Sequence, residues 1–266
     1  MRSFGEYRMN RPLFVLSLVA FCAFTAATVN AQEVKLGGVV SGFGAWYGGS
    51  DWNDAIDDID GQQGVSASNQ VRFGFSVGPA IEVGLVENFA VGTAVQYSRR
   101  GGGIEVTRND GSSADGTEVV NFVDIPGYLK PRLPLAAGIS IHALIGPQVS
   151  FIIGDVAREV EEGFVGVSET SSKSVEPDNR LIFGPTVGTG IAVNLGVGEL
   201  HVDLLYFRSF NAAFDDFIFE TGETFEGDLF QNLGLSLGLM IPLETDSTNS
   251  FTTGGPPVDS AAPVAY

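Results

Sequence analysis

The residues with the clearest chemical potential are the chain's two histidines, His142 and His201, with Asp203 two positions after the second. Imidazole and carboxylate groups act as general bases and metal ligands, and Ser140 or Ser150 offers a hydroxyl nucleophile. However, a zinc site requires three or four converging ligands, and acyl transfer requires oxyanion donors beside the nucleophile. The spacing of these residues supplies neither arrangement. We therefore expect no enzyme activity, no catalytic residues, no bound metal and no cofactor.

Six ionisable side chains share one face of the strand-like stretches described below. Each alternates with apolar residues, close to a short connection. If the stretches form a barrel of eight strands, this face points into an interior just wide enough for side chains. Unpaired charges are strongly unfavourable there. We therefore expect the six to pair into a polar lumen cluster, which consists of Glu82, Lys130, Arg132, His142, His201 and Asp203.

The elements that position these residues are eight stretches in which apolar residues tend to occupy every second place. In the clearest one, residues 231–243, leucine or isoleucine alternates with asparagine, glycine, serine, methionine or proline. A period of two indicates a β-strand. A second face without charges suits a crowded barrel interior, with the apolar face toward lipid. The stretches are residues 34–47, 70–84, 89–98, 119–132, 139–151, 181–194, 200–206 and 231–243.

The connections between these stretches alternate between long and short. The long ones are residues 49–69, 101–117, 154–179 and 211–228, and the short ones are residues 85–88, 133–137 and 195–198. Short turns on one rim and long loops on the other are typical of outer-membrane barrels. The sequence therefore predicts an all-β fold, an eight-stranded antiparallel transmembrane β-barrel of the outer membrane arranged as an up-and-down meander.

A soluble, lipocalin-like barrel is the alternative architecture, and the placement of charged and aromatic residues disfavours it. Such a barrel needs a polar outer surface, whereas most charges here lie in the long connections. Aromatic residues near the long-loop ends resemble the girdle that outer-membrane barrels place at the lipid–water interface. These residues are Trp46, Tyr47, Phe73, Tyr97, Phe151, Phe183, Tyr206 and Phe210.

Three prolines interrupt the alternating stretches. Pro79, Pro147 and Pro185 each follow a glycine inside a stretch. Because proline has no N–H to donate to a neighbouring strand, we expect bulges or bends at these positions.

The first 31 residues have the features of a secretory signal peptide. Arginines precede an apolar run over residues 13–27, and small residues at Val29 and Ala31 form a cleavage site. We expect cleavage near Ala31, which leaves 11 basic and 31 acidic side chains. Residues 32–243 then form the barrel domain in the outer membrane of a Gram-negative-type bacterium. Residues 244–266, rich in small and polar residues, are expected to form a disordered tail.

Acidic side chains outnumber basic ones by 32 to 14, which excludes nucleic acid as a partner. The first long connection is acidic, with Asp51, Asp54, Asp57, Asp58 and Asp60 and no basic residue. A solvated anionic surface is the simplest interpretation. The alternative is that these residues contact divalent cations that bridge them to lipopolysaccharide phosphates. The expected partners are thus outer-membrane lipid and lipopolysaccharide, and the sequence identifies no protein partner.

Two runs of residues resemble the PorT-like outer-membrane β-barrel family. One is Phe122-Val123-Asp124-Ile125-Pro126 followed by Lys130 and, after a short turn, by the segment from Ala143 to Phe151. The other is Gln96-Tyr97-Ser98-Arg99-Arg100-Gly101. The resemblance covers roughly residues 34–243 and implies the barrel fold. The family shares no catalytic residues, and a secretion role belongs to one branch only.

The function expected from these observations is structural, or an interaction at the cell surface through the long loops, with side chains plugging the lumen. A narrow porin-like channel for small solutes is the alternative. A barrel enzyme or a soluble lipocalin-like binder is less favoured.

Overall fold

The computed structural model describes residues 33–49, 53, 56–57, 59–61, 64–136, 138–164, 167–213, 216–218, 224–226 and 229–243. The side chains of residues 162–164, 167–169, 216–218 and 224–226 are not described. The expected signal peptide and the expected tail lie outside the described residues, as do Asp51, Asp54 and Asp58. Within the described part, no helix has both the length and the apolar character needed to span a membrane.

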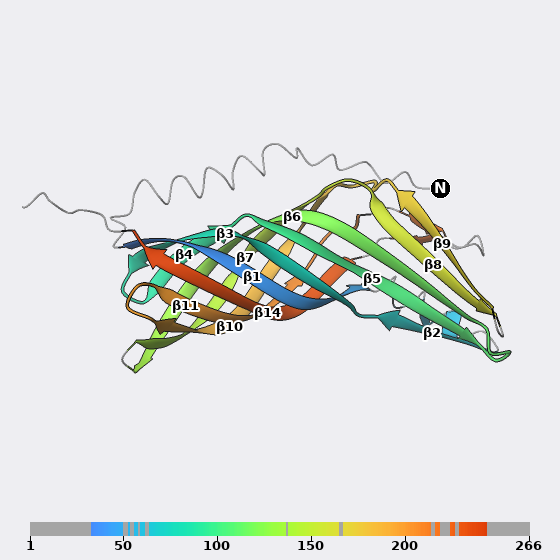
Figure 1. Ribbon diagram of the computed structural model, residues 1–266, viewed down its shortest axis with the longest axis horizontal. Helices are drawn as coiled ribbons and strands as arrows, with labels where there is room; N and C mark the ends of the chain where they lie inside the picture. The colour runs from blue at the N-terminus through green and yellow to red at the C-terminus, as the bar shows by residue number, and fades with distance from the viewer. Residues whose placement is uncertain are drawn as a thin grey trace, which may run out of the picture.

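Strand pairing closes a ring, because the first strand pairs with the last (Figure 1). β1 (Glu33–Gly48) runs antiparallel to β14 (Leu229–Pro242), from Lys35 opposite Pro242 to Gly48 opposite Leu229. From β1 the ring passes through β3 (Arg72–Val86), β4 (Phe89–Ala94) with β5 (Gln96–Arg108), β6 (Ser113–Ala136), β7 (Ile139–Ile152), β10 (Leu181–Asn194), β11 (Glu199–Arg208) and β14. Since β4 and β5 share one place, eight positions complete the ring. The predicted antiparallel, up-and-down β-barrel is confirmed.

The two faces of the ring strands differ as the alternation predicts. On β14, Leu233, Leu235, Leu237, Leu239 and Ile241 are exposed on the outside, whereas Ser236 and Met240 are buried inside. The same outward apolar surface continues around the ring, with exposed side chains that include Val40, Val77, Ile81, Leu129, Ile141, Ile145, Val187, Ile191 and Leu204. A belt of this kind would be unfavourable in water and is suited to lipid.

The prediction of loops at residues 101–117 and 154–179 is largely wrong, because strands continue through most of both segments. β5 and β6 stay paired from Gln96 opposite Asp124 to Thr107 opposite Ser113. Three further strands join them: β2 (Val65–Gln70), β8 (Val156–Phe164) and β9 (Val167–Val175). The resulting five-stranded extended sheet has the order β2-β5-β6-β8-β9 and projects beyond the ring (Figure 1). Neighbouring ladders satisfy its backbone groups, and Ile104, Val120 and Val156 become buried.

A tight turn at residues 109–112 joins β5 to β6 in the extended sheet. The Ser112 N–H and hydroxyl both donate to Asp110 Oδ1, at 2.9 and 2.6 Å. These two hydrogen bonds hold the pKa of Asp110 below its usual range. Gly111 adopts a φ of 84°, a left-handed conformation that glycine reaches without strain. A separate two-stranded hairpin pairs β12 (Asp216–Ile218) with β13 (Thr224–Glu226).

Pro79, Pro147 and Pro185 do not shift the register, contrary to the expectation of bulges. Val77 pairs with Tyr97 and Ala80 with Ala94, so the register continues across Pro79. At this position the Val95 N–H donates to the Pro79 carbonyl at 3.0 Å. Pro79 has no N–H to donate in return, so the hydrogen-bond ladder is interrupted between β4 and β5. Pro147 and Pro185 lie directly opposite each other. The register shifts lie instead beside short turns, at Gly84/Val86 and Pro134/Ala136.

Most of the aromatic residues expected at the membrane interface are exposed or half-buried, and Tyr47 is the exception. Phe73 and Phe210 are 82% and 66% exposed, and the Phe183 and Phe210 rings lie 6.2 Å apart. Tyr47 is fully buried, because the odd-numbered residues of the upper part of β1 face the lumen. The glycine-rich sequence of β1 hides this orientation, since glycine marks neither face.

Candidate functional site

Strand β6 shows how the lumen is filled, because its even-numbered residues point inward. From the short-turn rim toward the extended sheet these include Arg132, Lys130, Asp124, Phe122, Val120 and Glu118. Alternate residues on a strand rise by about 7 Å. The barrel interior therefore contains a charged layer near the short-turn rim, a second charged layer above it, and an apolar layer above both.

The first charged layer, called the lower cluster here, centres on Lys130. Its Nζ donates to Glu82 Oε2 at 3.0 Å and to His201 Nδ1 at 2.9 Å. Arg132 binds Glu82 and also Glu199, whose Oε1 lies 2.7 Å from Arg132 Nη1. Lys130 and Glu82 are almost fully buried. The barrel wall thus brings together side chains from β3, β6 and β11 that are far apart in the sequence.

The second histidine of the lower cluster forms a separate pair. His142 Nε2 lies 2.6 Å from Asp203 Oδ1, and the two histidine rings lie 5.7 Å apart. With Asp203 as acceptor, Nε2 is the protonated nitrogen of His142. All six residues expected in the lumen therefore lie in one region, and each of them contacts another polar side chain.

Two members of the lower cluster were missed by the sequence analysis. Lys35 Nζ lies 2.5 Å from Glu199 Oε2 and 3.1 Å from Glu33 Oε2. Lys35 lies in the glycine-rich first strand, whose facing the sequence leaves ambiguous, and Glu199 lies one residue past a predicted turn. The extra charges matter, because Lys35, Lys130 and Arg132 together balance the three carboxylates of Glu82, Glu199 and Asp203.

Three ligand-type side chains of the lower cluster, Glu82, Glu199 and His201, place one donor atom each within 4.8 Å of the others. Such a set could coordinate a divalent ion in principle. Here Lys130 already contacts both Glu82 and His201, and Arg132 contacts both carboxylates. A divalent ion would have to displace these cations from their partners. The donor set is therefore better suited to an ion-pair cluster than to a metal.

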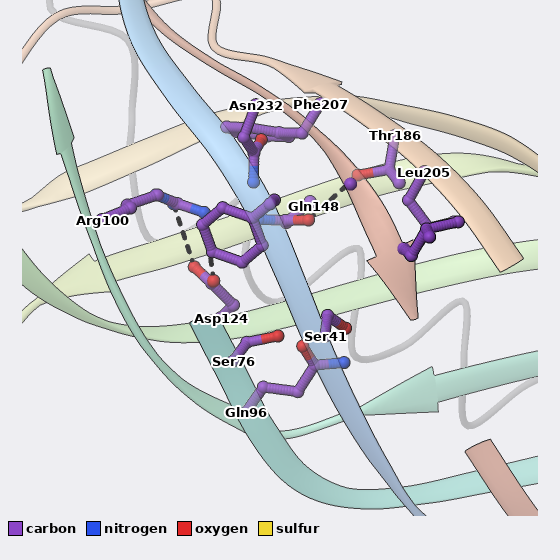
Figure 2. A pocket seen from close by; sticks show the side chains of 13 residues that line it. Ser41, Ser76, Gln96, Arg100, Asp124, Gln148, Thr186, Leu205, Phe207 and Asn232 are labelled. Atoms are coloured by element: carbon purple, nitrogen blue, oxygen red, sulfur yellow. Dashed lines mark hydrogen bonds and ion pairs between the residues drawn. The ribbon is translucent and has the colours of Figure 1, made fainter. Parts of the chain in front are cut away.

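The second charged layer is called the Arg100 layer, and Figure 2 shows its Arg100 and Asp124 side chains facing each other. Arg100 binds Asp124 through two hydrogen bonds of 3.1 Å and donates to Ser150 Oγ at 3.0 Å. Ser98 Oγ donates to Asp124 at 2.6 Å. The guanidinium also lies 4.1 Å from the Phe122 ring centroid, a cation–π contact. The buried guanidinium of Arg100 therefore forms hydrogen bonds through its N–H groups and stacks on an aromatic ring through its face.

The Arg100 layer was not predicted, although its signal was present in the sequence. Gln96, Ser98 and Arg100 alternate with Tyr97 and Arg99. The predicted strand ended at residue 98, so Arg100 fell beyond it. Extending the alternation by one more residue pair would have placed Arg100 inside the barrel.

A small cavity of about 40 Å³ adjoins the Arg100 layer (Figure 2). Its walls include Gln148 and Thr186, whose hydroxyl donates to Gln148 Oε1 at 3.0 Å. Asn232 Oδ1 lines the cavity without a hydrogen-bond partner in the protein. A cavity of this volume with polar side chains in its wall has room for ordered water, since one water molecule needs at least about 10–15 Å³. It is too small for an organic ligand.

The apolar layer, called the apolar plug here, closes the lumen beneath the extended sheet. Tyr47 and Phe122 pack on Phe230 with ring centroids 5.0 and 5.4 Å away. Ile56 and Ile59, from a short helical segment after β1, pack against this core. The buried members are Tyr47, Ile104, Val120, Phe122, Ile152, Val156, Ile182, Phe207, Ala213 and Phe230.

Side-chain pairing continues at the edge of the apolar plug. The Tyr47 hydroxyl donates to Glu118 Oε2 at 2.6 Å, and Arg158 Nε donates to Glu118 Oε1 at 2.5 Å. These contacts tie β1 and the extended sheet to β6. At the opposite, short-turn rim, an open cavity of about 390 Å³ ends at Glu82 and Arg132 of the lower cluster.

Of the five aspartates expected to contact cations, the structure describes two. Asp57 and Asp60 are both exposed, and Asp60 Oδ1 accepts a hydrogen bond of 3.2 Å from the Ala67 N–H. Asp60 thus caps a backbone donor of β2. Asp51, Asp54 and Asp58 lie outside the described residues, so the described part contains no converging acidic set in this segment.

A comparison with protein families identifies the barrel. Residues 32–215 match the family described as the outer membrane protein beta-barrel domain. The chain belongs to this outer-membrane β-barrel family. The membership agrees with the apolar outer belt and indicates that the protein resides in the outer membrane.

Several solved outer-membrane proteins resemble the chain distantly. Ail, the attachment invasion locus protein of Yersinia pestis, is 13% identical with a TM-score of 0.34 over 79% of this chain and 100% of its own. OprG from Pseudomonas aeruginosa is 9% identical with a TM-score of 0.39 over 81% and 99%. Neisserial surface protein A is 10% identical with a TM-score of 0.30 over 77% and 96%. The search of curated proteins found no match.

A glycine on β10 makes room for the His142–Asp203 pair and offers a test of it. A Cβ at Gly190 would clash with Asp203 Oδ1, and it would lie 2.5 Å from the Val202 carbonyl oxygen and 2.8 Å from His142 Nε2. We expect Gly190→Ala to lower the free energy of unfolding by about 1–3 kcal/mol. Gly238→Ala is the matched control, because a Cβ there lies 3.7 Å from its nearest neighbour, His201 Cβ. Urea titrations followed by tryptophan fluorescence would compare them, and equal losses would contradict the tight fit.

Proposed function

We propose that this protein is a closed, non-conducting outer-membrane barrel whose role is structural or is an interaction at the cell surface. The observation that supports the proposal is the filled lumen. The lower cluster, the Arg100 layer and the apolar plug lie at successive levels along the barrel. A solute passing through would have to separate buried ion pairs and then part a packed aromatic core, both of which are energetically costly.

The surface role rests on the extended sheet. Five strands continue beyond the ring, well past the exposed apolar belt. A barrel that served only as a membrane scaffold would not require such a projection. The extended sheet is held rigidly to the barrel by the apolar plug and by the Glu118 contacts, which suits it to present a fixed surface to a partner.

The finer assignments are part of the same proposal. We propose membership of the PorT-like family, because the runs around Phe122 and Ala143 resemble it, and the secretion role of one branch of that family is not part of the proposal. Cleavage near Ala31 would release the barrel from its signal peptide. Lipid and lipopolysaccharide are the proposed surroundings, with divalent cations at the acidic loops. We assign no catalytic role, because the histidines, the groups best suited to catalysis, already pair with charged partners.

Planar-bilayer recordings test the closed lumen. The purified wild-type protein should give no steady conductance, whereas a general porin in the same bilayer serves as the positive control. Tyr47→Ala combined with Phe230→Ala should remain silent or give brief openings, because the two charged layers remain. A steady ohmic current from the wild-type protein would overturn the proposal and favour the narrow channel.

A further inference from the structure

The two edges of the extended sheet are treated differently by the protein. At the β2 edge, the Ala67 N–H donates to Asp60 Oδ1 at 3.2 Å, and the Asn69 side chain donates to the Tyr47 carbonyl at 2.5 Å. These contacts cap one backbone donor of β2 and tie its edge to β1. At the other edge, β9 pairs with β8 and with no other strand that the structure describes.

The β9 edge lacks most of the features that prevent strand addition. Its pairing with β8 runs without a shift from Val156 opposite Val175 to Phe164 opposite Val167, so no bulge twists it away. The strand contains no proline, and its one basic residue is Lys173. Residues 170–174 are exposed on both faces. An exposed, regular edge of this length is a template for an added strand unless it is protected.

Charges on the neighbouring strand indicate what kind of strand would fit. Glu159 pairs with Ser172 and Glu161 with Thr170, so both carboxylates lie one strand in from the edge on the same face. Ser172 and Thr170 lie between these carboxylates and the edge, and their side chains are short enough for a long side chain of an added strand to reach over them. A strand added to β9 would lie about 10 Å from β8, a distance that a lysine or arginine and a glutamate can bridge together. On the opposite face, Lys173 itself lies at the edge beside Arg158.

From these observations we infer that the β9 edge binds an extended segment of a partner protein, which adds to the sheet as an antiparallel strand. The segment has basic residues opposite Thr170 and Ser172 and an acidic residue opposite Lys173. A second copy of this chain is a poor occupant, since the net charge of −18 makes copies repel. The inference rests on the proposed surface role and specifies its partner.

A short peptide provides the direct test. In antiparallel orientation the required order is Glu-Lys-Thr-Lys, so the probe is fluorescent Thr-Val-Glu-Lys-Thr-Lys-Val-Thr, titrated into the barrel in uncharged detergent. The control peptide, Thr-Val-Lys-Lys-Thr-Glu-Val-Thr, has the same composition and charge. We expect the control to bind at least about fivefold more weakly, because cross-strand charge pairs become mismatched. Equal binding of both, or no binding of the probe, would overturn the inference.

Variants of the strand show whether binding occurs at the edge. Neighbouring residues on β9 direct their N–H groups to opposite sides, so we compare Ser171→Pro with Ser172→Pro. One of these two serines directs its N–H away from β8, and proline at that position should abolish probe binding. The same variant should keep the heat-modifiable gel mobility of the folded barrel. Glu159→Lys should weaken binding severalfold. Undiminished binding in both proline variants, or a concentration-dependent dimer that excludes the probe, would overturn the inference. The absence of conductance in planar bilayers does not depend on these results. The proposal of a closed lumen and the inference of a binding site at the β9 edge can therefore fail separately.

Discussion

Replacing Lys130 with methionine should lower the free energy of unfolding by about 3–5 kcal/mol, the usual effect of removing one partner from a buried ion pair. The lysine is almost fully buried, and its Nζ contacts Glu82 and His201 at 3.0 and 2.9 Å. Methionine fills a similar volume but removes one of the two cations that contact the buried Glu82 and leaves His201 Nδ1 without its donor. Urea unfolding of the barrel in lipid vesicles, followed by tryptophan fluorescence and gel mobility, would measure the loss.

Two further variants isolate the cause of that loss. Lys173→Met removes an exposed lysine from β9 and should change stability by no more than about 0.5 kcal/mol. Lys130→Met combined with Glu82→Leu removes both charges, and Arg132 keeps Glu199 as its partner. The double variant should recover much of the stability, because an apolar pair often replaces a buried ion pair at little cost. If the double variant were less stable than Lys130→Met alone, the pairing account would be wrong.

Replacing Phe230 with alanine should cost about 3–5 kcal/mol, since it opens a cavity in a packed aromatic core. Phe230 is buried between Tyr47 and Phe122, whose ring centroids lie 5.0 and 5.4 Å away. The loss should also loosen the extended sheet, because the same core includes Ile104 and Val156. Urea unfolding measures the first effect, and amide exchange in β8 measures the second.

Phe73→Ala is the matched control for the apolar plug. It removes the same atoms from a side chain that is 82% exposed on the outer surface. Lipid or detergent can fill the space left there, so the loss should be clearly smaller than for Phe230. A loss as large as that of Phe230→Ala would show that the apolar plug is not well packed.

Much of the lumen could be predicted from residue parity alone. Glu82, Lys130, His142 and His201 each lie in a stretch with a clear period of two, so their inward direction follows from the alternation. Lys35 could not be placed in this way, because it lies beside glycines that mark neither face. Arg100 continues the alternation of Gln96 and Ser98 just before the glycines at residues 101–103, and it was missed only because the predicted strand ended at residue 98.

The extended sheet was hidden for a related reason. Residues 101–117 and 154–179 are rich in glycine, serine and acidic residues, which are typical of loops. Their strands form because each finds a neighbour: β5 lies beside β6, and β6 lies beside β8. Strand propensity depends strongly on such context, so the sequence of one segment does not reveal a partner far along the chain.

The sequence by itself determined the number of ring strands, the face of each strand that meets lipid, and the rim at which the short turns lie. These follow from a local rule, because side chains on a strand alternate and an apolar face must leave water. Only the tertiary structure decided which inward side chains meet. Closing the ring sets the register between β1 and β14, and that register brings Lys35 to Glu199. Contacts across the lumen depend on this closure, which no single strand encodes.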